Sequence, residues 1–157
     1  MEYIKAADEN KNIIFDIVQT TVRTVYPKYY PKEVVDFFCE HHRRENIAKD
    51  IQSGNAGILM VDNQIIGTGC RVDNHITRVY VLPEFQGRGY GSFIMQCLED
   101  EISVRHHTVE LDASLPASHL YEQRGYCTIK HEKLPVKNGA VLVYEVMEKV
   151  LPEKKRV

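Results

Sequence analysis

The sequence lacks the features of a membrane-anchored, secreted or nucleic-acid-binding protein. No apolar run approaches the ~20 residues that span a bilayer, and the start of the chain, Met1 to Lys5, lacks the basic region and apolar stretch of a secretory leader. The formal net charge of -2 provides no broad basic field to hold a phosphate backbone. We therefore expect a cytoplasmic protein that binds neither a membrane nor nucleic acid.

Cysteine pairs and linkers are lacking as well. The four cysteines form no Cys-x-x-Cys pair, so they are typical of reduced, scattered thiols and predict no metal site. For Cys97, on a predicted helix, a role as a small core hydrophobe is favoured over one as an acyl-accepting nucleophile. No repeat or Pro/Gly/Ser-rich linker divides the 157 residues. We expect one domain over residues 1–150 and a frayed tail over residues 151–157.

Helical periodicity marks the first part of the chain. After a short strand at Ile4, Asp8 or Asn10 can cap a helix that Pro27 closes. A second helix is predicted from Pro31, with its apolar residues facing inward. The charged end of this helix, over residues 41–45, carries adjacent histidines that point about 100° apart, which is poor geometry for one metal. A solvated helix face is the favoured interpretation there.

From Ala56 the pattern changes to that of strands. The runs 57–61 and 65–72 are separated by Asp62-Asn63-Gln64 and predict a hairpin, and a third run over 75–82 completes an antiparallel meander. A helix then begins near Gly89, with Glu99 expected on its wet side. The remaining predicted elements are a strand over 108–113, a helix over 117–124 that Gly125 stops, and strands over 126–132 and 140–148.

A glycine-rich turn joins the meander to the helix near Gly89. Its sequence is Gln86-Gly87-Arg88-Gly89-Tyr90-Gly91-Ser92. Unpaired amides at a helix start, together with the helix dipole, favour phosphate oxygens, and glycines let the backbone approach them closely. Arg88 can add a charged contact. Taken alone, three glycines can also form a purely structural turn, but their spacing fits neither a dinucleotide fold nor a P-loop.

Two motifs resemble the GCN5-related N-acetyltransferase (GNAT) superfamily. Gln86 to Gly91 match its phosphate-binding signature Gln/Arg-x-x-Gly-x-Gly/Ala, and residues 120–126, Leu-Tyr-Glu-Gln-Arg-Gly-Tyr, match its Leu-Tyr-Glu-x-x-Gly-Phe/Tyr element. The motifs occur in the family's order, and the order of predicted elements agrees over essentially the whole chain. The resemblance implies an α/β (α+β) fold, with a mixed, mostly antiparallel sheet of about seven strands, splayed between strands 4 and 5 and flanked by about four helices.

The resemblance also implies an N-acetyltransferase that moves an acetyl group from acetyl-coenzyme A to a primary amine of a small molecule or protein. The pantetheine arm would bond to the strand before the turn, and the pyrophosphate would lie on the amides of the turn. Ser114 stands in a loop where many relatives carry an asparagine, and it can substitute as a polar contact. The implied coenzyme-binding residues are Val79, Val81, Gln86, Gly87, Arg88, Gly89, Tyr90, Gly91, Ser92 and Ser114.

Acetyl transfer needs a neutral amine, donors for the developing oxyanion and an acid for the departing thiolate. The resemblance implies Tyr121 as the acid, with simple packing against the coenzyme as the alternative. The resemblance implies Asp112 as the candidate catalytic base, because some relatives carry a carboxylate at this position of the fifth strand. Glu84, His75 and a chain of waters are open alternatives for that role.

The acceptor is expected beside the splay, near the first two helices. Tyr26, Tyr29 and Tyr30 are candidate walls of its pocket, although tyrosines next to prolines can equally form a packed corner. A non-catalytic acyl-coenzyme A sensor of the same fold is the main alternative function, and a nucleotide-binding module is a third. Exposed strand edges at the C-terminal end make a homodimer plausible.

Overall fold

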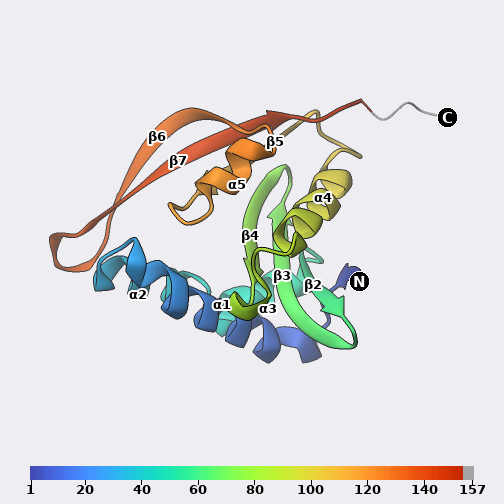
Figure 1. Cartoon of the computed structure of the whole chain (residues 1–157), viewed down its shortest axis with the longest axis horizontal. Coiled ribbons are helices and arrows are strands. Elements are labelled where there is room, and N and C mark those ends of the chain that lie inside the picture. Colours follow the sequence, from blue (N-terminus) through green and yellow to red (C-terminus); the bar gives the residue numbers. More distant parts are fainter. Residues whose placement is uncertain (154–157) are drawn as a thin grey trace.

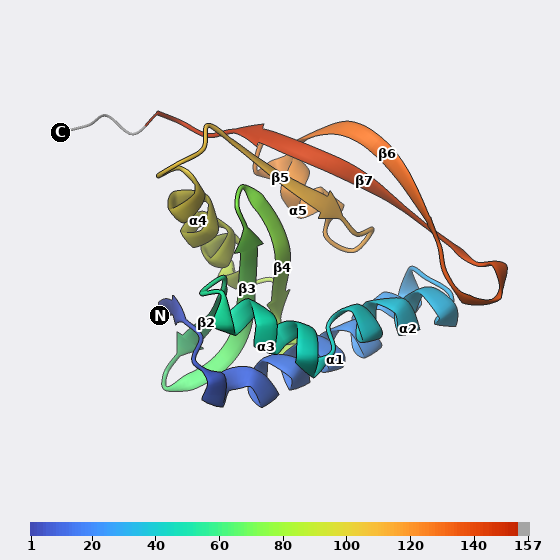
Figure 2. The ribbon, with the colours of Figure 1, turned by 180° about the vertical axis from the view of Figure 1, so that it is seen from behind.

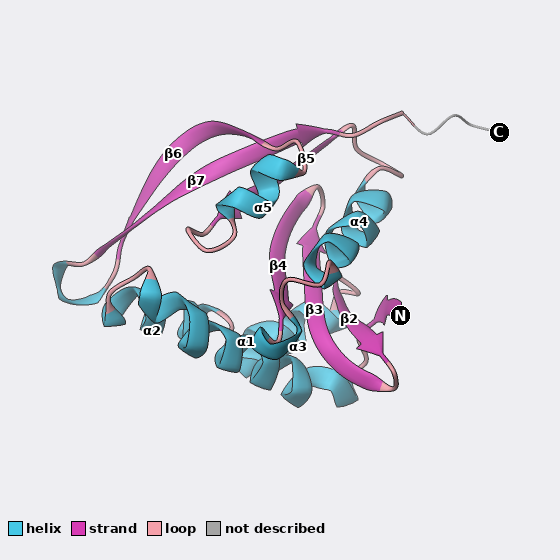
Figure 3. Cartoon of the chain, viewed as in Figure 1, coloured by secondary structure: helices cyan, strands magenta, loops and turns pink. Residues whose placement is uncertain are grey.

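The computed structural model describes residues 1–153. Its centre is one mixed β-sheet. Its strands lie in the order β1-β2-β3-β4-β5-β7-β6, and Figure 3 shows them between two groups of helices. Neighbouring strands are antiparallel except for β4 and β5, which are parallel. The strands are β1 (Glu2–Lys5), β2 (Ala56–Val61), β3 (Gln64–Val72), β4 (His75–Val81), β5 (Thr108–Ala113), β6 (Cys127–Pro135) and β7 (Val141–Val150). The predicted sheet is confirmed.

The splay between β4 and β5 is the feature that positions the site. The two strands are paired at His75 with Glu110 and at Ile76 with Leu111, and no further pair joins them within residues 1–153. Beyond Ile76 the strands diverge, so the rest of β4 leaves the half of the sheet that contains β5, β7 and β6 (Figure 1). The predicted splay is confirmed.

Helices cover both faces of the sheet. They are α1 (Lys11–Val25), α2 (Lys32–His41), α3 (Arg44–Gln52), α4 (Tyr90–Ile102) and α5 (Ser118–Gln123). Helix α1 buries a stripe spaced three and four residues apart, which consists of Ile14, Ile17, Val18, Thr21 and Val22. This stripe packs with α2, α3 and one face of the sheet, whereas α4 and α5 belong to a second core on the other face.

Helix α3 follows α2 directly and lies beside α1 (Figure 2). The sequence analysis assigned it to no element, because its buried apolar residues are few, Ile47 and Ile51, and its other positions are mostly polar. The charged end of α2 is also different from the prediction of a solvated face. His41 is exposed, but His42 is only 5% exposed. The prediction was wrong for His42, because the turn into α3 folds its ring against β4.

Helix α4 lies unusually close to β3 because two glycines of β3 have no side chain. A Cβ atom at Gly69 would lie 2.7 Å from Ile94 Cγ2, and one at Gly67 would lie 3.0 Å from Ile94 Cδ1. The close approach lets Ile94, Met95 and Leu98 become fully buried. It thereby fixes the start of α4 against the end of β4.

Glu99 was expected on the wet face of α4, and this expectation was wrong. The residue is 3% exposed, and its carboxylate accepts hydrogen bonds from Arg124 Nη2 at 2.7 Å and from the Tyr126 hydroxyl at 2.8 Å. Lys149 Nζ lies 3.4 Å from the same carboxylate. Arg124 and Tyr126 belong to the second sequence motif, so Glu99 ties that motif to α4.

The last described residues pack against the rest of the fold. Leu151 is buried, and its amide donates a hydrogen bond of 2.7 Å to the His107 carbonyl. The rest of the predicted tail, residues 154–157, lies outside the described residues. Among residues 1–153, no helix has the length and apolar character needed to cross a bilayer.

Candidate active site

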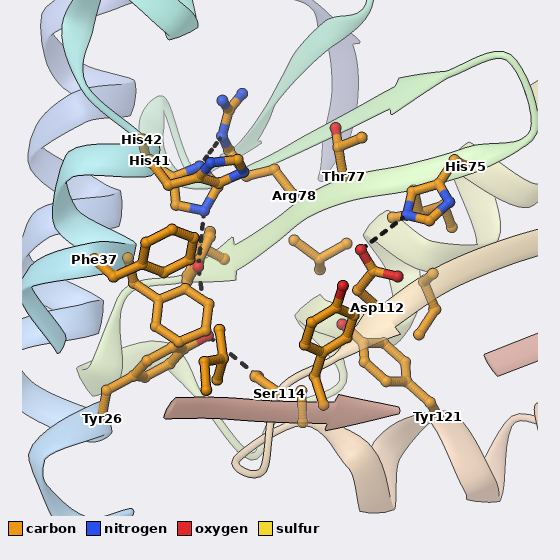
Figure 4. Close-up of a pocket in the computed structure, with 18 of the residues that line it drawn as sticks. Tyr26, Phe37, His41, His42, His75, Thr77, Arg78, Asp112, Ser114 and Tyr121 are labelled. Atoms are coloured by element: carbon orange, nitrogen blue, oxygen red, sulfur yellow. Dashed lines mark hydrogen bonds and ion pairs between the residues drawn. The ribbon is translucent and has the colours of Figure 1, made fainter. Parts of the chain in front are cut away.

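Two clefts meet at the splay. The first, which we name the turn cleft, has a volume of about 390 Å³ and is lined by the end of β4, the glycine-rich turn, the start of α4 and the start of α5. The second, the aromatic cleft, has a volume of about 310 Å³ and lies between α2, β4, β5 and the β6–β7 hairpin (Figure 4). Both volumes lie within the range of small-molecule sites. The residues that line both clefts are Tyr26, Val79, Tyr80, Ala117 and Tyr121.

The turn cleft is built on backbone that only glycine adopts easily. Gly87 has a φ of 77° and Gly89 a φ of 86°, both in the left-handed region. Helix α4 begins directly after Gly89, and no side chain caps it. The amides of its first turn, at Tyr90, Gly91 and Ser92, therefore lack partners within the helix. Because these residues line the cleft, their amides and the positive end of the helix dipole form a site for anionic oxygens.

The space over this turn is open. A Cβ atom at Gly87 or Gly89 would meet no atom of the described chain within 4 Å. The glycines are therefore not required by crowding within the protein. The turn therefore leaves open space beside its amides, and the residues present fit a pyrophosphate.

Some main-chain N–H and C=O groups of β4 point into the gap between β4 and β5. The Val81 carbonyl accepts a hydrogen bond from Gln86 Nε2 at 2.9 Å and a long one from Thr21 Oγ1 at 3.4 Å, so it points away from β3. In an antiparallel pair the N–H and C=O of one residue point the same way, and alternate residues repeat that direction. The main-chain groups of Val79 therefore also face the gap, where β5 has left the sheet.

Of the predicted coenzyme contacts, Arg88 and Ser114 lie outside the turn cleft. The Gln86 side chain braces the turn against β4 through the hydrogen bond to Val81 just described. Arg88 does not line the turn cleft; its guanidinium lies 5.7 Å from the centre of the Phe85 ring. Ser114 lines the aromatic cleft, where its Oγ lies 3.2 Å from the Tyr26 hydroxyl. The remaining predicted coenzyme residues, Val79, Val81, Gln86, Gly87, Gly89, Tyr90, Gly91 and Ser92, all line the turn cleft.

Tyr121 lies where the two clefts join. Its ring packs 5.9 Å from that of Tyr126, and within residues 1–153 its hydroxyl has no hydrogen-bond partner. Burial, with a smaller contribution from Tyr26, raises the pKa of Tyr121 well above its usual value of 10.0. The hydroxyl is therefore protonated at neutral pH and can donate its proton to an atom at the junction.

A chain of polar side chains runs along the helix side of the junction. Arg78 Nη2 donates to Asp50 at 2.8 Å, and Arg78 Nε lies 3.3 Å from His42 Nδ1. Since a guanidinium can only donate, His42 Nδ1 must accept, and the neutral ring carries its proton on Nε2. That nitrogen lies 3.2 Å from the Tyr80 hydroxyl, to which it donates. The Tyr80 and Tyr26 hydroxyl oxygens are 3.4 Å apart.

Burial is the main reason why His42 stays neutral, and the Arg78 charge adds to it. Together they lower the pKa of His42 well below its usual value of 6.5. His42 is therefore a fixed hydrogen-bond donor rather than a base. Burial likewise holds the pKa of Tyr80 well above 10.0, so its hydroxyl also stays protonated.

Asp112 and His75 face each other across the start of the splay. His75 Nε2 lies 3.6 Å from Asp112 Oδ2, and both residues line the aromatic cleft (Figure 4). The Asp112 carboxylate raises the pKa of His75 above 6.5. Of the other candidate base, Glu84, the structure shows that it is exposed and lines neither cleft.

The tyrosines near the first helix are divided between the two clefts. Tyr26 lines both clefts and Tyr29 lines the turn cleft. Tyr30 accepts a hydrogen bond of 2.7 Å from the Leu115 amide. Tyr26 and Tyr30 thus hold the loop after β5 across the gap.

The glycine-rich turn, the splayed strands and the motif around Tyr121 agree with a known family. A family model described as an acetyltransferase (GNAT) domain matches residues 25–150. The chain belongs to the GNAT acetyltransferase family. It is therefore an acyltransferase, and residues of the Gln86 to Gly91 signature line the turn cleft.

Individual GNAT proteins share this fold over nearly the whole chain. A GCN5-related N-acetyltransferase from Rhodopseudomonas palustris has a TM-score of 0.87 at 20% identity, covering 96% of this chain and 95% of that one. The PaiA N-acetyltransferase from Thermoplasma acidophilum, solved in complex with coenzyme A, has a TM-score of 0.74 at 15% identity, covering 95% and 98%. The uncharacterized N-acetyltransferase YafP of Escherichia coli is 24% identical over 122 residues, 74% of each chain.

Several residues that line the aromatic cleft were not predicted from the sequence. His42, Arg78, Tyr80 and Phe37 were not among the predicted site residues, although all line the aromatic cleft. Of these, only Arg78 could have been identified from the sequence, because a charged residue at an inward position of an alternating strand is unusual. No group of three His, Cys, Asp or Glu residues that could hold a metal occurs within residues 1–153.

Proposed function

We propose that this GNAT protein uses acetyl-coenzyme A to acetylate a primary amine at the junction of the two clefts. The observation that supports this most strongly is the meeting of an open anion site, over the first turn of α4, with an aromatic cleft in which the Asp112 carboxylate faces His75. The pyrophosphate would lie on the amides from Gly87 to Ser92, with Arg88 reaching it from the turn. The pantetheine arm would follow Val79 and Val81 toward Tyr121.

The reaction joins the amine nitrogen to the thioester carbonyl carbon and breaks the bond from that carbon to sulfur. A protonated amine must first lose a proton, and the departing sulfur gains one. Tyr121 is proposed to supply the sulfur's proton, because its hydroxyl is protonated, unengaged and placed at the junction. The tyrosinate would then recover a proton from solvent.

Asp112 is proposed to attract the charged amine and to accept its proton, directly or through water. Its carboxylate is half-exposed in the aromatic cleft and is paired with His75, whose proton can leave to solvent. Ser114 is proposed to contact the coenzyme arm from the loop after β5, with its hydroxyl held by Tyr26.

Replacing Tyr121 by phenylalanine tests the assignment. We expect turnover, measured as thiol release from acetyl-coenzyme A, to fall about 100-fold or more, as general acids typically contribute. The dissociation constant for acetyl-coenzyme A, measured by calorimetry, should change by less than about twofold, because the ring is kept.

Tyr126→Phe is the matched control, since this ring lies beside Tyr121 but its hydroxyl is bound to Glu99. It should lower the melting temperature and leave turnover nearly unchanged. Equal turnover in wild type and Tyr121→Phe would remove Tyr121 from the mechanism. A wild type that binds acetyl-coenzyme A but acetylates no amine would favour the alternative function, a non-catalytic sensor.

Assembly and location stay predictions from the sequence. The strand order places β6 at one edge of the sheet, and most of its residues are exposed, which supports a homodimer through that edge. Light scattering of the purified chain would give the mass of a dimer if this holds and of a monomer if it does not. The cytoplasmic location is tested by cell fractionation.

A further inference from the structure

Six aromatic residues, Tyr26, Phe37, Phe38, Tyr80, Tyr121 and Tyr144, line the aromatic cleft. Phe37 and Phe38 come from α2, Tyr26 follows α1, and Tyr144 with Leu142 comes from β7 on the opposite side. Figure 4 shows Phe37 and Tyr26 on the helix side of an open centre, with Asp112 and Tyr121 across from them. Phe37 is only partly buried, and its ring stacks on His41 at a centroid distance of 5.6 Å. An apolar body entering here would therefore bury further ring surface.

Most polar groups around this centre are already engaged with one another. His42 is held between Arg78 and the Tyr80 hydroxyl, and the Tyr26 hydroxyl lies 3.2 Å from Ser114 Oγ. These contacts leave the helix side of the cleft with few free donors for a polar acceptor. On that side, a sugar or other hydroxyl-rich acceptor would regain few of the hydrogen bonds that it makes with water.

The charges also limit the acceptor. Among the described residues that line the cleft, Arg78 is the permanent cation, but its side chain is 3% exposed and ion-paired with Asp50 at 2.8 Å. Its Nη1 has no partner within residues 1–153, yet Figure 4 shows the guanidinium beyond His42 rather than in the open centre. A carboxylate or phosphate on the acceptor would therefore meet no permanent cation in the open centre. The partly exposed His75 ring can carry a positive charge, but it already faces the Asp112 carboxylate at 3.6 Å. Asp112, in contrast, offers a half-exposed carboxylate to an ammonium group.

We propose that the acceptor is a primary amine carried on a ring-bearing apolar body, with no carboxylate or phosphate group. The ammonium group lies near Asp112, and the ring lies against Phe37 and its neighbours, which leaves the amine facing the junction at Tyr121. This inference rests on the proposed acetyltransferase function and deepens it by naming the substrate class. A free amino acid and a nucleotide amine are disfavoured by their anionic groups, and a polyamine is disfavoured because Asp112 is the one carboxylate among the described residues that line the aromatic cleft.

The test compares amines that differ in one feature at saturating acetyl-coenzyme A. 2-Phenylethylamine carries the ring and the amine, phenylalanine adds a carboxylate, ethylamine lacks the ring, and spermidine or a lysine-containing peptide represents the other classes. We expect kcat/KM for 2-phenylethylamine to exceed that for phenylalanine by about tenfold or more, because the added carboxylate is desolvated without a partner. It should also exceed that for ethylamine by about tenfold or more, because the ring adds buried apolar area.

A pair of variants assigns the effect to the cleft. Phe37→Ala should raise the KM for 2-phenylethylamine about tenfold while changing that for ethylamine less than about twofold. Val143→Ala is the control, since Val143 is 50% exposed, lies next to Tyr144 in sequence and lines neither cleft. It should change neither KM. Equal losses with both amines in Phe37→Ala would indicate a structural role for that ring and overturn the assignment.

The outcomes separate this inference from the function on which it rests. Preferred turnover of spermidine or the lysine peptide would keep the acetyltransferase function and overturn the substrate class. Acetyl-coenzyme A binding without turnover of any amine would overturn both the class and catalysis. Failure to bind acetyl-coenzyme A in calorimetry would overturn the coenzyme site itself.

Discussion

Replacing Gly89 by alanine separates the backbone role of the turn from its proposed role in coenzyme binding. Gly89 has a φ of 86°, and a Cβ atom there would meet no atom of the described chain within 4 Å. The loss of stability therefore comes from the left-handed backbone alone, about 1–2 kcal/mol. For a chain of this size that lowers the melting temperature by about 2–8 °C.

Gly54 provides a matched control because it has the same two properties elsewhere in the fold. Its φ is 71°, a Cβ atom there would also meet nothing within 4 Å, and it lines neither cleft. Gly54→Ala should therefore lose a similar amount of stability. The two variants share the backbone effect and differ in whether the new methyl group lies over the first turn of α4.

Calorimetric titration with acetyl-coenzyme A reads out that difference. Gly89→Ala should bind the coenzyme about tenfold more weakly or worse, because the methyl group keeps phosphate oxygens from the amides. Gly54→Ala should bind it within about twofold of wild type. If Gly89→Ala loses stability as expected but keeps its full affinity, the turn is structural and the reasoning about the anion site is refuted.

Three further predictions follow from buried or paired charges. Glu99→Ala should cost about 3–5 kcal/mol, because it removes the buried carboxylate that accepts from Arg124 and Tyr126; a calorimetric melting temperature within about 2 °C of wild type would contradict this. His75 is charged below its raised pKa and competes with the ammonium group for Asp112, so the amine KM should fall as pH rises through that pKa. Comparison with His75→Ala isolates this effect, and identical pH profiles would exclude it. Because the pKa of His42 is lowered in the folded protein, the unfolded chain binds a proton at this residue at a higher pH than the folded protein does. The contribution of His42 to the free energy of unfolding is therefore present above pH 6.5 and is lost as the pH falls. His42→Gln should flatten the decline of the melting temperature between about pH 7 and pH 5, and an unchanged slope would show that another group causes it.

The parts of this protein that could be predicted from its sequence are those set by short-range patterns. The alternation through β2, β3 and β4 and the turn at Asp62 and Asn63 depend on neighbours along the chain. The glycine-rich turn was also predictable, because the left-handed backbone at Gly87 and Gly89 strongly favours glycine at these positions. These elements are sufficient to indicate the fold and the proposed coenzyme site.

The helix side of the aromatic cleft could not be predicted because it depends on polar pairs far apart in sequence. His42 and Arg78 are separated by 36 residues, and Arg78 and Asp50 by 28. Each of these residues alone is typical of a solvated surface. Only the packing of the turn between α2 and α3 against β4 brings them together and buries His42. Glu99 has the same explanation, since its partners Arg124 and Lys149 arrive from later elements.

A crystal structure of the protein with coenzyme A bound tests the central claim most directly. The account predicts pyrophosphate oxygens within hydrogen-bonding distance, about 3 Å, of the amides that open α4, with the thiol end beside Tyr121. Phosphates bound away from the residues between Gly87 and Ser92, or a thiol that lies outside the junction of the two clefts, would contradict it.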